Sequence, residues 1–197
     1  MTIGWAHDQR DSAILPTKGG LMRANAEAGL PGGTVQYYKL TGQAQWYYPI
    51  SRTYTLMLNG EIGDANGMGG KPLPFYKNFY AGGVTSVRGY NSYSLGPRDS
   101  AGAILGGTKR IVGNGEVLFP VPGTGVDRSM RLAVFLDAGQ VFGADEQMRL
   151  SDLRYSTGLA FSWNSPMGPL RLSYGEPLNA KSGDNKQHIQ FQFGQSF

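Results

Sequence analysis

Residues 152 to 164 read Asp-Leu-Arg-Tyr-Ser-Thr-Gly-Leu-Ala-Phe-Ser-Trp-Asn, and the large apolar side chains recur at every second position. One alternate set comprises Leu153, Tyr155, Thr157, Leu159, Phe161 and Trp163, and the other comprises Arg154, Ser156, Gly158, Ala160 and Ser162. A β-strand points successive side chains to opposite faces, whereas a helix would spread them around its surface. The stretch therefore predicts a strand with one apolar face and one polar face.

The same alternation recurs along the chain and predicts a protein made of strands. In residues 38 to 50, Tyr38, Leu40, Gly42, Ala44, Trp46, Tyr48 and Ile50 alternate with Lys39, Thr41, Gln43, Gln45 and Tyr47. Candidate strands lie near residues 2 to 8, 20 to 30, 34 to 50, 53 to 64, 109 to 121, 128 to 142, 152 to 164, 168 to 176 and 187 to 197. Some connections are short and rich in turn residues, but residues 65 to 108 form one long loop. A loop of that length is usually functional or disordered.

The composition favours a membrane barrel over a soluble fold. The 197 residues include 30 Gly, 11 Tyr and 9 Phe, and no apolar run approaches the roughly 20 residues that a membrane-spanning helix needs. In a transmembrane β-barrel only alternate residues face lipid, so a mean hydropathy of −0.31 is compatible with one. A soluble sandwich or ligand-binding barrel would also alternate. We expect an all-β, antiparallel transmembrane β-barrel.

Charge and cysteine usage restrict the classes of partner and the cellular compartment that the chain is suited to. The chain has no cysteine, which excludes disulfides and thiol nucleophiles and is compatible with an oxidising periplasm. Its net charge of +4 suits anionic lipid heads, but the basic residues are scattered and no nucleic-acid motif accompanies them, so no nucleic acid is expected. Met1 leads directly into a strand-like segment without a signal-peptide pattern. We therefore expect a mature fragment of a longer exported protein.

Residues suited to catalysis are sparse. Only His7 and His188 titrate near neutral pH, and neither lies beside a nucleophile motif. Residues 63 to 71 partly resemble a phosphate-binding loop, but Pro72 occupies the position at which that motif requires Ser or Thr. We expect no enzyme activity, no catalytic residue, no metal and no cofactor.

The long loop carries the most specific motif. It contains Pro-Phe-Tyr-Lys-Asn-Phe-Tyr-Ala-Gly-Gly at residues 74 to 83 and the tetrad Val87, Arg88, Gly89 and Tyr90. This resembles the lumen-inserted loop of the BamA superfamily of outer-membrane protein assembly factors. A turn with Asp8, Arg10, Asp11, Pro16 and Gly19 and the stretch Trp-Asn-Ser-Pro-Met-Gly-Pro-Leu at residues 163 to 170 resemble further family segments. Together these cover nearly the whole chain.

The resemblance implies an architecture and a location. The chain would be the C-terminal eight or nine strands of a larger family barrel, with residues 65 to 108 as its inserted loop and without the periplasmic repeat domains. It would lie in the cell outer membrane of a Gram-negative bacterium.

Arg88 needs anionic partners if the loop lies inside the barrel. A guanidinium in a narrow lumen requires carboxylates to offset its desolvation. Glu116 and Asp137 fall on the polar faces of two candidate strands, in contexts that resemble the family strands that receive the loop arginine. Gly89 would allow a tight turn beside the wall. The alternative is an ordinary solvated loop arginine.

The final segment resembles the terminal recognition signal of outer-membrane barrels. Ile189, Phe191, Phe193 and Phe197 would face lipid, and Gly194 would interrupt the strand and weaken its pairing. In the family this last strand pairs weakly with the first barrel strand, at a seam thought to open for incoming strands. Packing of a simple edge strand would explain the alternation equally well.

Three functions remain open. The resemblance favours an insertase that folds and inserts outer-membrane β-barrel proteins, and the alternatives are a two-partner-type polypeptide secretion pore of the same superfamily and a passive channel. The implied partners are outer-membrane lipids including lipopolysaccharide, nascent β-barrel proteins and, for the full-length protein, the lipoproteins of an assembly complex.

An open half-wall would expose unpaired backbone groups, so closure is expected. Alone, the chain would close as an eight-stranded barrel in which Thr2 to Asp8 is not a wall strand and the loop is expelled from the lumen. Alternatively, two copies would pair edge to edge as a dimer. In a wider wall the loop would dock inside.

Overall fold

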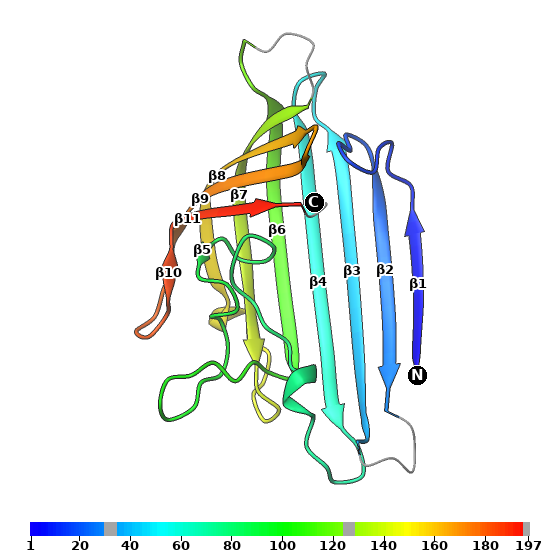
Figure 1. Cartoon of the computed structure of the whole chain (residues 1–197), viewed down its shortest axis with the longest axis vertical. Helices are drawn as coiled ribbons and strands as arrows, with labels where there is room; N and C mark the ends of the chain where they lie inside the picture. Colours follow the sequence, from blue (N-terminus) through cyan, green and yellow to red (C-terminus); the bar gives the residue numbers. More distant parts are fainter. Residues whose placement is uncertain (30–34, 124–128, 195–197) are drawn as a thin grey trace.

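The computed structural model describes residues 1–29, 35–123 and 129–194, and these fold as one curved antiparallel sheet (Figure 1). Within these ranges nine strands follow the order β1-β2-β3-β4-β6-β7-β8-β9-β11. Their bounds are β1 (Thr2–Asp8), β2 (Gly19–Ala28), β3 (Tyr37–Pro49), β4 (Thr55–Gly67), β6 (Lys109–Pro120), β7 (Met130–Phe142), β8 (Arg154–Ser165), β9 (Gly168–Pro177) and β11 (Ile189–Phe193). Two short strands, β5 (Gly89–Tyr90) and β10 (Lys186–Gln187), form a separate pair, and the 3-10 turns are η1 (Phe75–Lys77) and η2 (Leu150–Asp152). No helix in the described ranges is long and apolar enough to cross a membrane.

Each candidate strand of the sequence corresponds to an observed strand, with small shifts at the ends. The largest correction concerns the long loop, which we expected to start at residue 65. Strand β4 continues to Gly67 because its end pairs with the start of β3, where Tyr37 lies opposite Gly67. The loop therefore covers residues 68 to 108. Parts of four candidate strands, at residues 30, 34, 128 and 195 to 197, lie outside the described residues.

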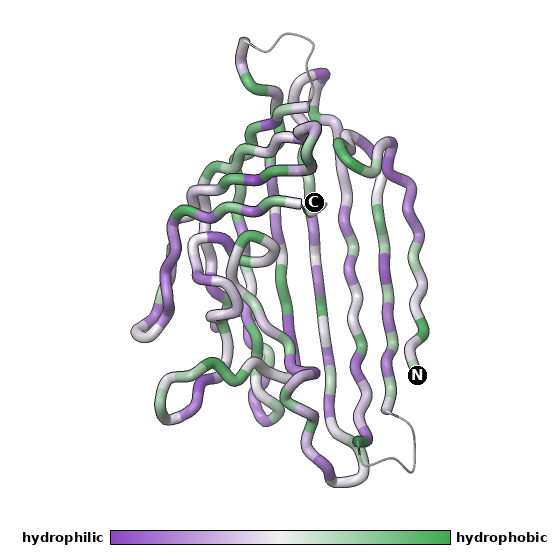
Figure 2. Tube along the Cα trace, viewed as in Figure 1, coloured by the Kyte–Doolittle hydropathy of each residue, from purple (hydrophilic) through white to green (hydrophobic). Residues whose placement is uncertain are grey.

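Alternate residues point to opposite faces of the sheet, as the sequence predicts. In β8, Leu159 and Trp163 are exposed on the outer face, whereas Ser156 and Ala160 are buried on the inner face. Figure 2 shows apolar and polar residues alternating along the strands. Leu153 departs from the pattern, because it precedes β8 and caps η2, and its side chain is buried.

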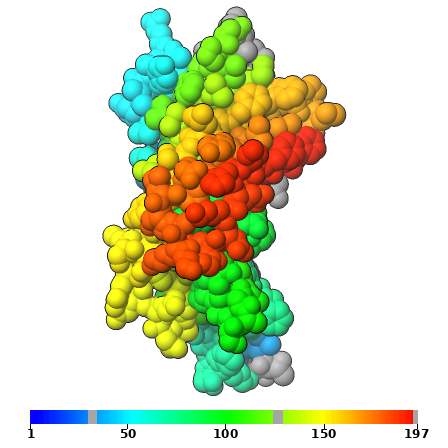
Figure 3. All heavy atoms as spheres, turned by 90° about the vertical axis from the view of Figure 1, so that its left-hand side faces the viewer, coloured from blue at the N-terminus to red at the C-terminus, as the bar shows by residue number. Residues whose placement is uncertain are grey.

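The inner face is covered by the long loop rather than by a second sheet. Strands β8, β9 and β11 run across the others on the left of Figure 1, and the loop lies in the hollow that results. The main hydrophobic cluster joins loop residues to inner-face residues of the wall: Ala65, Phe79, Ala81, Val87, Tyr90, Leu95, Val112 and Val141. Figure 3 shows, from the left-hand side, the loop packed below the last strands. The core is therefore made between loop and wall.

Closure as an eight-stranded barrel is wrong for this structure. β1 is a full strand that pairs with β2 from Thr2 to Asp8, and among the described residues β1 and β11 do not pair with each other. An eight-stranded lumen is just filled by side chains and has no room for a loop of this size. The loop takes the space that self-closure would remove. The arrangement matches the expectation for a wider wall.

The two edges of the sheet carry different connections. Residues 9 to 18, 50 to 54 and 166 to 167 connect strands at one end of the sheet, whereas the connections at the other end include residues 68 to 108, 143 to 153 and 178 to 188 and are longer on average. Outer-membrane barrels have short periplasmic turns and longer extracellular loops. By this rule the long loop starts and ends at the extracellular edge and folds back along the inner face.

Candidate functional site

The tetrad of the long loop is fully buried against the wall. Val87 and Tyr90 are 0% exposed and Arg88 is 1% exposed. The loop turns tightly before it: the amide of Gly83 donates to the carbonyls of Val87 at 3.1 Å and of Tyr90 at 3.0 Å. Gly83 has a φ of +96°, a conformation that side chains disfavour. The turn presents Arg88 to the inner face of the sheet.

Arg88 reaches both acids that the sequence singles out. Its Nη1 lies 2.6 Å from Oε1 of Glu116 on β6, and its Nη2 lies 2.6 Å from Oδ1 of Asp137 on β7. Its Nε and its backbone amide both donate to Oδ2 of Asp137, at 2.7 and 3.0 Å. The ring of Phe135 stacks 3.5 Å from the guanidinium carbon. A planar fork with this many donors suits two carboxylates better than a lysine would.

Sequence reasoning missed two further members of this buried cluster. Arg171 on β9 contacts Glu116, so two cations face two acids. Asn114 on β6 donates to the carbonyl of Ser86 at 2.6 Å and to Asp137 at 2.8 Å, and so ties the loop to the acid. Alternation places both residues on polar faces, but it gives no sign of which partners they meet.

An amide relay extends from Asn114 across the inner wall. Gln43 on β3 donates to Asn59 on β4 at 2.9 Å, and Asn59 donates to Asn114 at 3.0 Å. The relay continues through Asn114 to Asp137. It joins four neighbouring strands at the level of the tetrad.

The second half of the tetrad contacts the last strands. Gly89 and Tyr90 form β5, which pairs with β10. Gly89 has a φ of +85°, and a Cβ there would lie 3.0 Å from the carbonyl oxygen of Gly175. Gln190 on β11 donates to the carbonyl of Tyr90 at 2.6 Å. The tetrad therefore spans from the middle of the sheet to its last described strand.

A separate cluster holds the base of the loop at the extracellular edge. Lys77 lies 2.5 Å from Glu27 on β2, and Lys39 on β3 donates to the carbonyl of Lys77 at 2.7 Å. The ammonium of Lys39 also lies 4.1 Å from the ring centre of Phe79. The hydrogen bond to Glu27, with a second to Tyr37, raises the pKa of Lys77, so the ammonium stays charged at neutral pH.

The residues of the last segment lie as the alternation predicts. Ile189, Phe191 and Phe193 are exposed on the outer face, and Gln190 between them is buried. Gly194 follows the end of β11 with a φ of +78°. Phe197 lies outside the described residues.

The turn between β1 and β2 is held by its own polar residues and by the far wall. Asp8 pairs with Arg10 at 2.8 Å, and Asp11 accepts hydrogen bonds from the backbone and hydroxyl of Thr17. Gly19 has a φ of +95°. Arg131 on β7 donates to the carbonyls of Leu15 and Pro16, both at 2.8 Å. The turn therefore crosses the inner side of the sheet.

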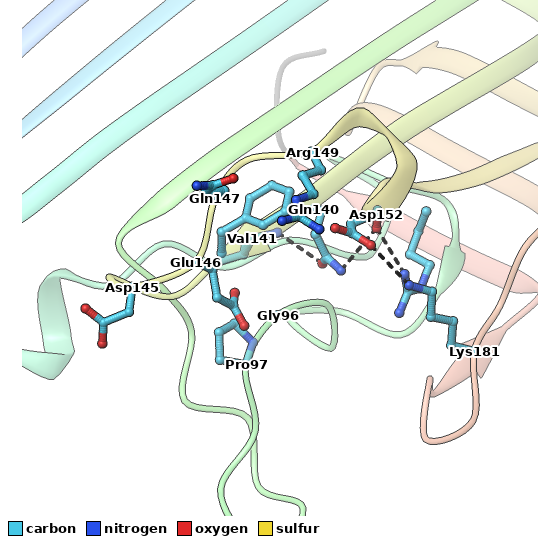
Figure 4. Close-up of a pocket in the computed structure, with 12 residues that line it drawn as sticks. Gly96, Pro97, Gln140, Val141, Asp145, Glu146, Gln147, Arg149, Asp152 and Lys181 are labelled. Carbon is cyan, nitrogen blue, oxygen red and sulfur yellow. Dashed lines mark hydrogen bonds and ion pairs between the residues drawn. The ribbon is translucent and has the colours of Figure 1, made fainter.

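A polar crevice of about 600 Å³ lies at the extracellular edge, between the long loop and two later connections (Figure 4). Asp152 lies 3.4 Å from Lys181 in its wall, and Gly96 and Pro97 come from the long loop. Within residues 1–29, 35–123 and 129–194, no group of His, Cys, Asp and Glu residues is arranged to hold a metal ion.

Comparisons with known proteins agree on one family. The model of the Omp85 superfamily domain matches residues 1–197. The outer membrane protein assembly factor BamA of Neisseria meningitidis serogroup B is 42% identical over the whole chain, and the match covers 28% of that protein. BamA of Nitratidesulfovibrio vulgaris is 32% identical over 99% of the chain and 25% of its own length. The sorting and assembly machinery component 50 homolog of Xenopus tropicalis is 32% identical over 90% of the chain and 41% of its own length.

A solved structure agrees with these relatives. BamA from Haemophilus ducreyi lacking POTRA domains 1–3 superposes with a TM-score of 0.89 and 27% identity, over 96% of this chain and 41% of that one. The chain belongs to the Omp85 superfamily, and its fold is that of part of a BamA barrel. It spans about a quarter of the length of the BamA proteins that it matches in sequence.

Proposed function

We propose that this chain is part of the barrel of an outer-membrane insertase, which folds β-barrel proteins and inserts them into the outer membrane of a Gram-negative bacterium. The observation that carries the proposal is the 42% identity, over the whole chain, to a protein named as an outer membrane protein assembly factor. The match to a sorting and assembly machinery component supports the same role. We propose a non-enzymatic function, in which the wall and its docked loop act on a folding client.

The buried ion cluster supports a wall that stays organised while a client folds beside it. Arg88 fixes the loop to β6 and β7 through direct contacts of 2.6 Å with Glu116 and Asp137. Leaving either acid buried without its counter-charge would be costly. We infer that the docked loop keeps the centre of the wall rigid and ties the last strands to it through Gln190 and Tyr90.

The proposed partners follow from the two faces and the family. Exposed residues such as Leu40, Trp46 and Leu159 form an outer surface suited to outer-membrane lipids, including lipopolysaccharide. Nascent outer-membrane β-barrel proteins would be the clients. The lipoproteins of an assembly complex would be partners of the full-length protein.

A polypeptide secretion pore of the same superfamily is the second candidate. It would use the same docked tetrad, so the tetrad does not separate the two functions. The number of periplasmic repeat domains in the full-length protein does, because about five favour the insertase and about two favour a secretion pore by family resemblance. A passive channel is less well supported, because the described loop occupies the inner face.

The insertase proposal is tested by reconstituting the full-length protein in liposomes and measuring the folding of a test β-barrel protein. We expect faster folding than in liposomes without protein. Folding at the lipid-only rate, with the protein correctly inserted, would contradict the proposal. The 197-residue chain alone should not accelerate folding, because it corresponds to only 28% of its Neisseria relative.

For the isolated chain we also propose pairing of two copies edge to edge. β1 and β11 each have one neighbour among the described strands, and pairing would satisfy backbone groups that hydrocarbon cannot. The mass in detergent and cross-links between terminal strands test this proposal. A monomer, or a dimer without such cross-links, would contradict it.

A further inference from the structure

The last described strand has a side-chain pattern that does not specify its own register. β11 spans five residues, Ile-Gln-Phe-Gln-Phe, and it is the shortest strand of the nine-stranded sheet in the described ranges. In the observed register Phe191 lies opposite Leu172 and Gln190 opposite Ser173 on β9. A slip of two residues would bring Phe193 opposite Leu172 and Gln192 opposite Ser173. The apolar residues would still face outward and a glutamine would still face inward, so alternation cannot exclude the slip.

Contacts from the long loop distinguish the two registers. The amide of Gln190 donates to the carbonyl of Tyr90, which also accepts from the amide of Gly83 in the loop turn. Just before β11, the pairing of β10 with β5 sets Lys186 opposite Tyr90 and Gln187 opposite Gly89. The amide of Asn91 donates to the carbonyl of Asn185 at 2.8 Å. These contacts fix the backbone that leads into β11.

The loop in turn is fixed to the centre of the sheet. Arg88, next to Gly89, is held by Glu116 and Asp137, and Tyr90 is packed in the main hydrophobic cluster. The carbonyl that receives Gln190 is therefore a rigid reference point.

We propose that the docked loop sets the register of β11 against β9. The hydrogen bond from Gln190 to the Tyr90 carbonyl is the contact that selects this register. Gln192 offers the same amide two positions later, so it takes the Tyr90 carbonyl when Gln190 cannot. This role does not rest on the proposed function, because a secretion pore with the same docked loop would need the same register.

Two cysteine pairs on the outer face report the register. The opposite pair, Leu172→Cys and Phe191→Cys, places two cysteines directly across from each other in the observed register, at a Cβ separation of about 4.5–5.5 Å. Leu172→Cys with Phe193→Cys are diagonal, at about 7–8 Å, which is too far for a disulfide without movement. The chain has no cysteine of its own, so each pair can be oxidised without competition from this region.

The experiment compares Gln190→Met with Gln192→Met in the full-length, membrane-inserted protein. Each methionine variant is made twice, once with the opposite cysteine pair and once with the diagonal pair. Only folded protein is scored, separated by its electrophoretic mobility before and after heating. Without either methionine, the opposite pair should form most of the disulfide and the diagonal pair a small, measurable fraction of it. Gln190→Met should raise the ratio of diagonal to opposite disulfide about fivefold, the effect of losing one typical hydrogen bond. Gln192→Met, the matched control, should leave the ratio unchanged or lower it.

Equal ratios in the two methionine variants would overturn the proposal, because the two glutamines would then be equivalent. An unchanged ratio in Gln190→Met would overturn it as well. If Gln190→Met does not fold, Gln190→Ala replaces it, since alanine has no side-chain donor for Tyr90 and adds neither bulk nor charge. Client folding is measured separately, so loss of insertase activity and loss of register are distinguishable.

Discussion

The first two strands of the sheet and the later strand β7 share an alternating pattern but differ in what covers them. β1 is exposed at each of its seven residues, and most of β2 is exposed, whereas β7 alternates between exposed residues and buried ones such as Phe135 and Asp137. Both regions alternate in sequence. The difference comes from the long loop, which packs against the inner faces of the later strands. Much of the burial in this wall is therefore conferred by the loop, and the cluster of Ala133, Phe135 and Ala160 adds a smaller part from the wall itself.

The strongest test of this comparison removes the charge at its centre. Arg88→Ala leaves Glu116 and Asp137 buried without their shared counter-charge from the loop, and we expect a loss of stability on the order of 3 kcal/mol or more. Unfolding by urea in lipid vesicles measures it. Arg23→Ala, on the uncovered inner face of β2, is the matched control and should cost about 0.5 kcal/mol or less. Equal losses of stability in both variants would show that the buried contacts of Arg88 contribute no more than an exposed arginine does.

A glycine pair provides the next largest contrast. A Cβ at Gly175, on the covered part of the wall, would lie 2.6 Å from the backbone nitrogen of Gly89. Gly175→Ala should therefore displace the tetrad and cost about 1–3 kcal/mol. A Cβ at Gly60, on the outer face, would meet nothing within 4 Å, so Gly60→Ala should be close to neutral. Protease sensitivity of the loop would report the displacement, and an unaltered loop in Gly175→Ala would contradict close packing at this point.

The cluster at the base of the loop should contribute less. Lys77 and Glu27 are each about a quarter exposed, so solvent screens their attraction. Lys77→Met should cost roughly 0.2–1 kcal/mol, measured by the same urea unfolding. The double variant with Glu27→Gln should cost little more stability than Lys77→Met alone, because both substitutions remove the same ion pair. Strictly additive losses would show that the two residues act independently.

The smallest expected effect lies in the turn between β1 and β2. Partial burial raises the pKa of Asp11, but hydrogen bonds from Thr17 and Lys18 outweigh it, so the pKa lies below its ordinary value of 3.8. The turn is therefore stabilised above pH 3.8, and this contribution is lost as the pH falls through the lowered pKa. Hydrogen-exchange protection of the Thr17 and Lys18 amides, corrected for the intrinsic pH dependence of exchange, measures it across this range. Asp11→Asn should remove the pH dependence, and a dependence that persists would assign it to another group.

Much of the wall could be predicted from the sequence because its signal is local. Alternation over 152 to 164 needs only neighbouring residues, and the strand lies at 154 to 165. Arg88, Glu116 and Asp137 could be connected because a buried arginine needs acids and because the family motif points to the strands that hold them. Arg171 and Gln190 could not, because their partners depend on how far the last strands bend across the inner face. The choice between a self-closed barrel and a wider wall could not be made from the sequence for a related reason, since the space taken by the loop is a property of the whole fold.

The docked loop also constrains the order in which the chain can fold. Gln190 and Tyr90 are 100 residues apart in sequence, and Arg88 and Asp137 are 49 apart. Contacts between such distant residues carry a high entropy of loop closure, which favours forming adjacent hairpins first. The loop can only dock after the strands that receive it exist. Docking is therefore a late event, and the time at which the loop becomes resistant to protease would mark the completion of folding.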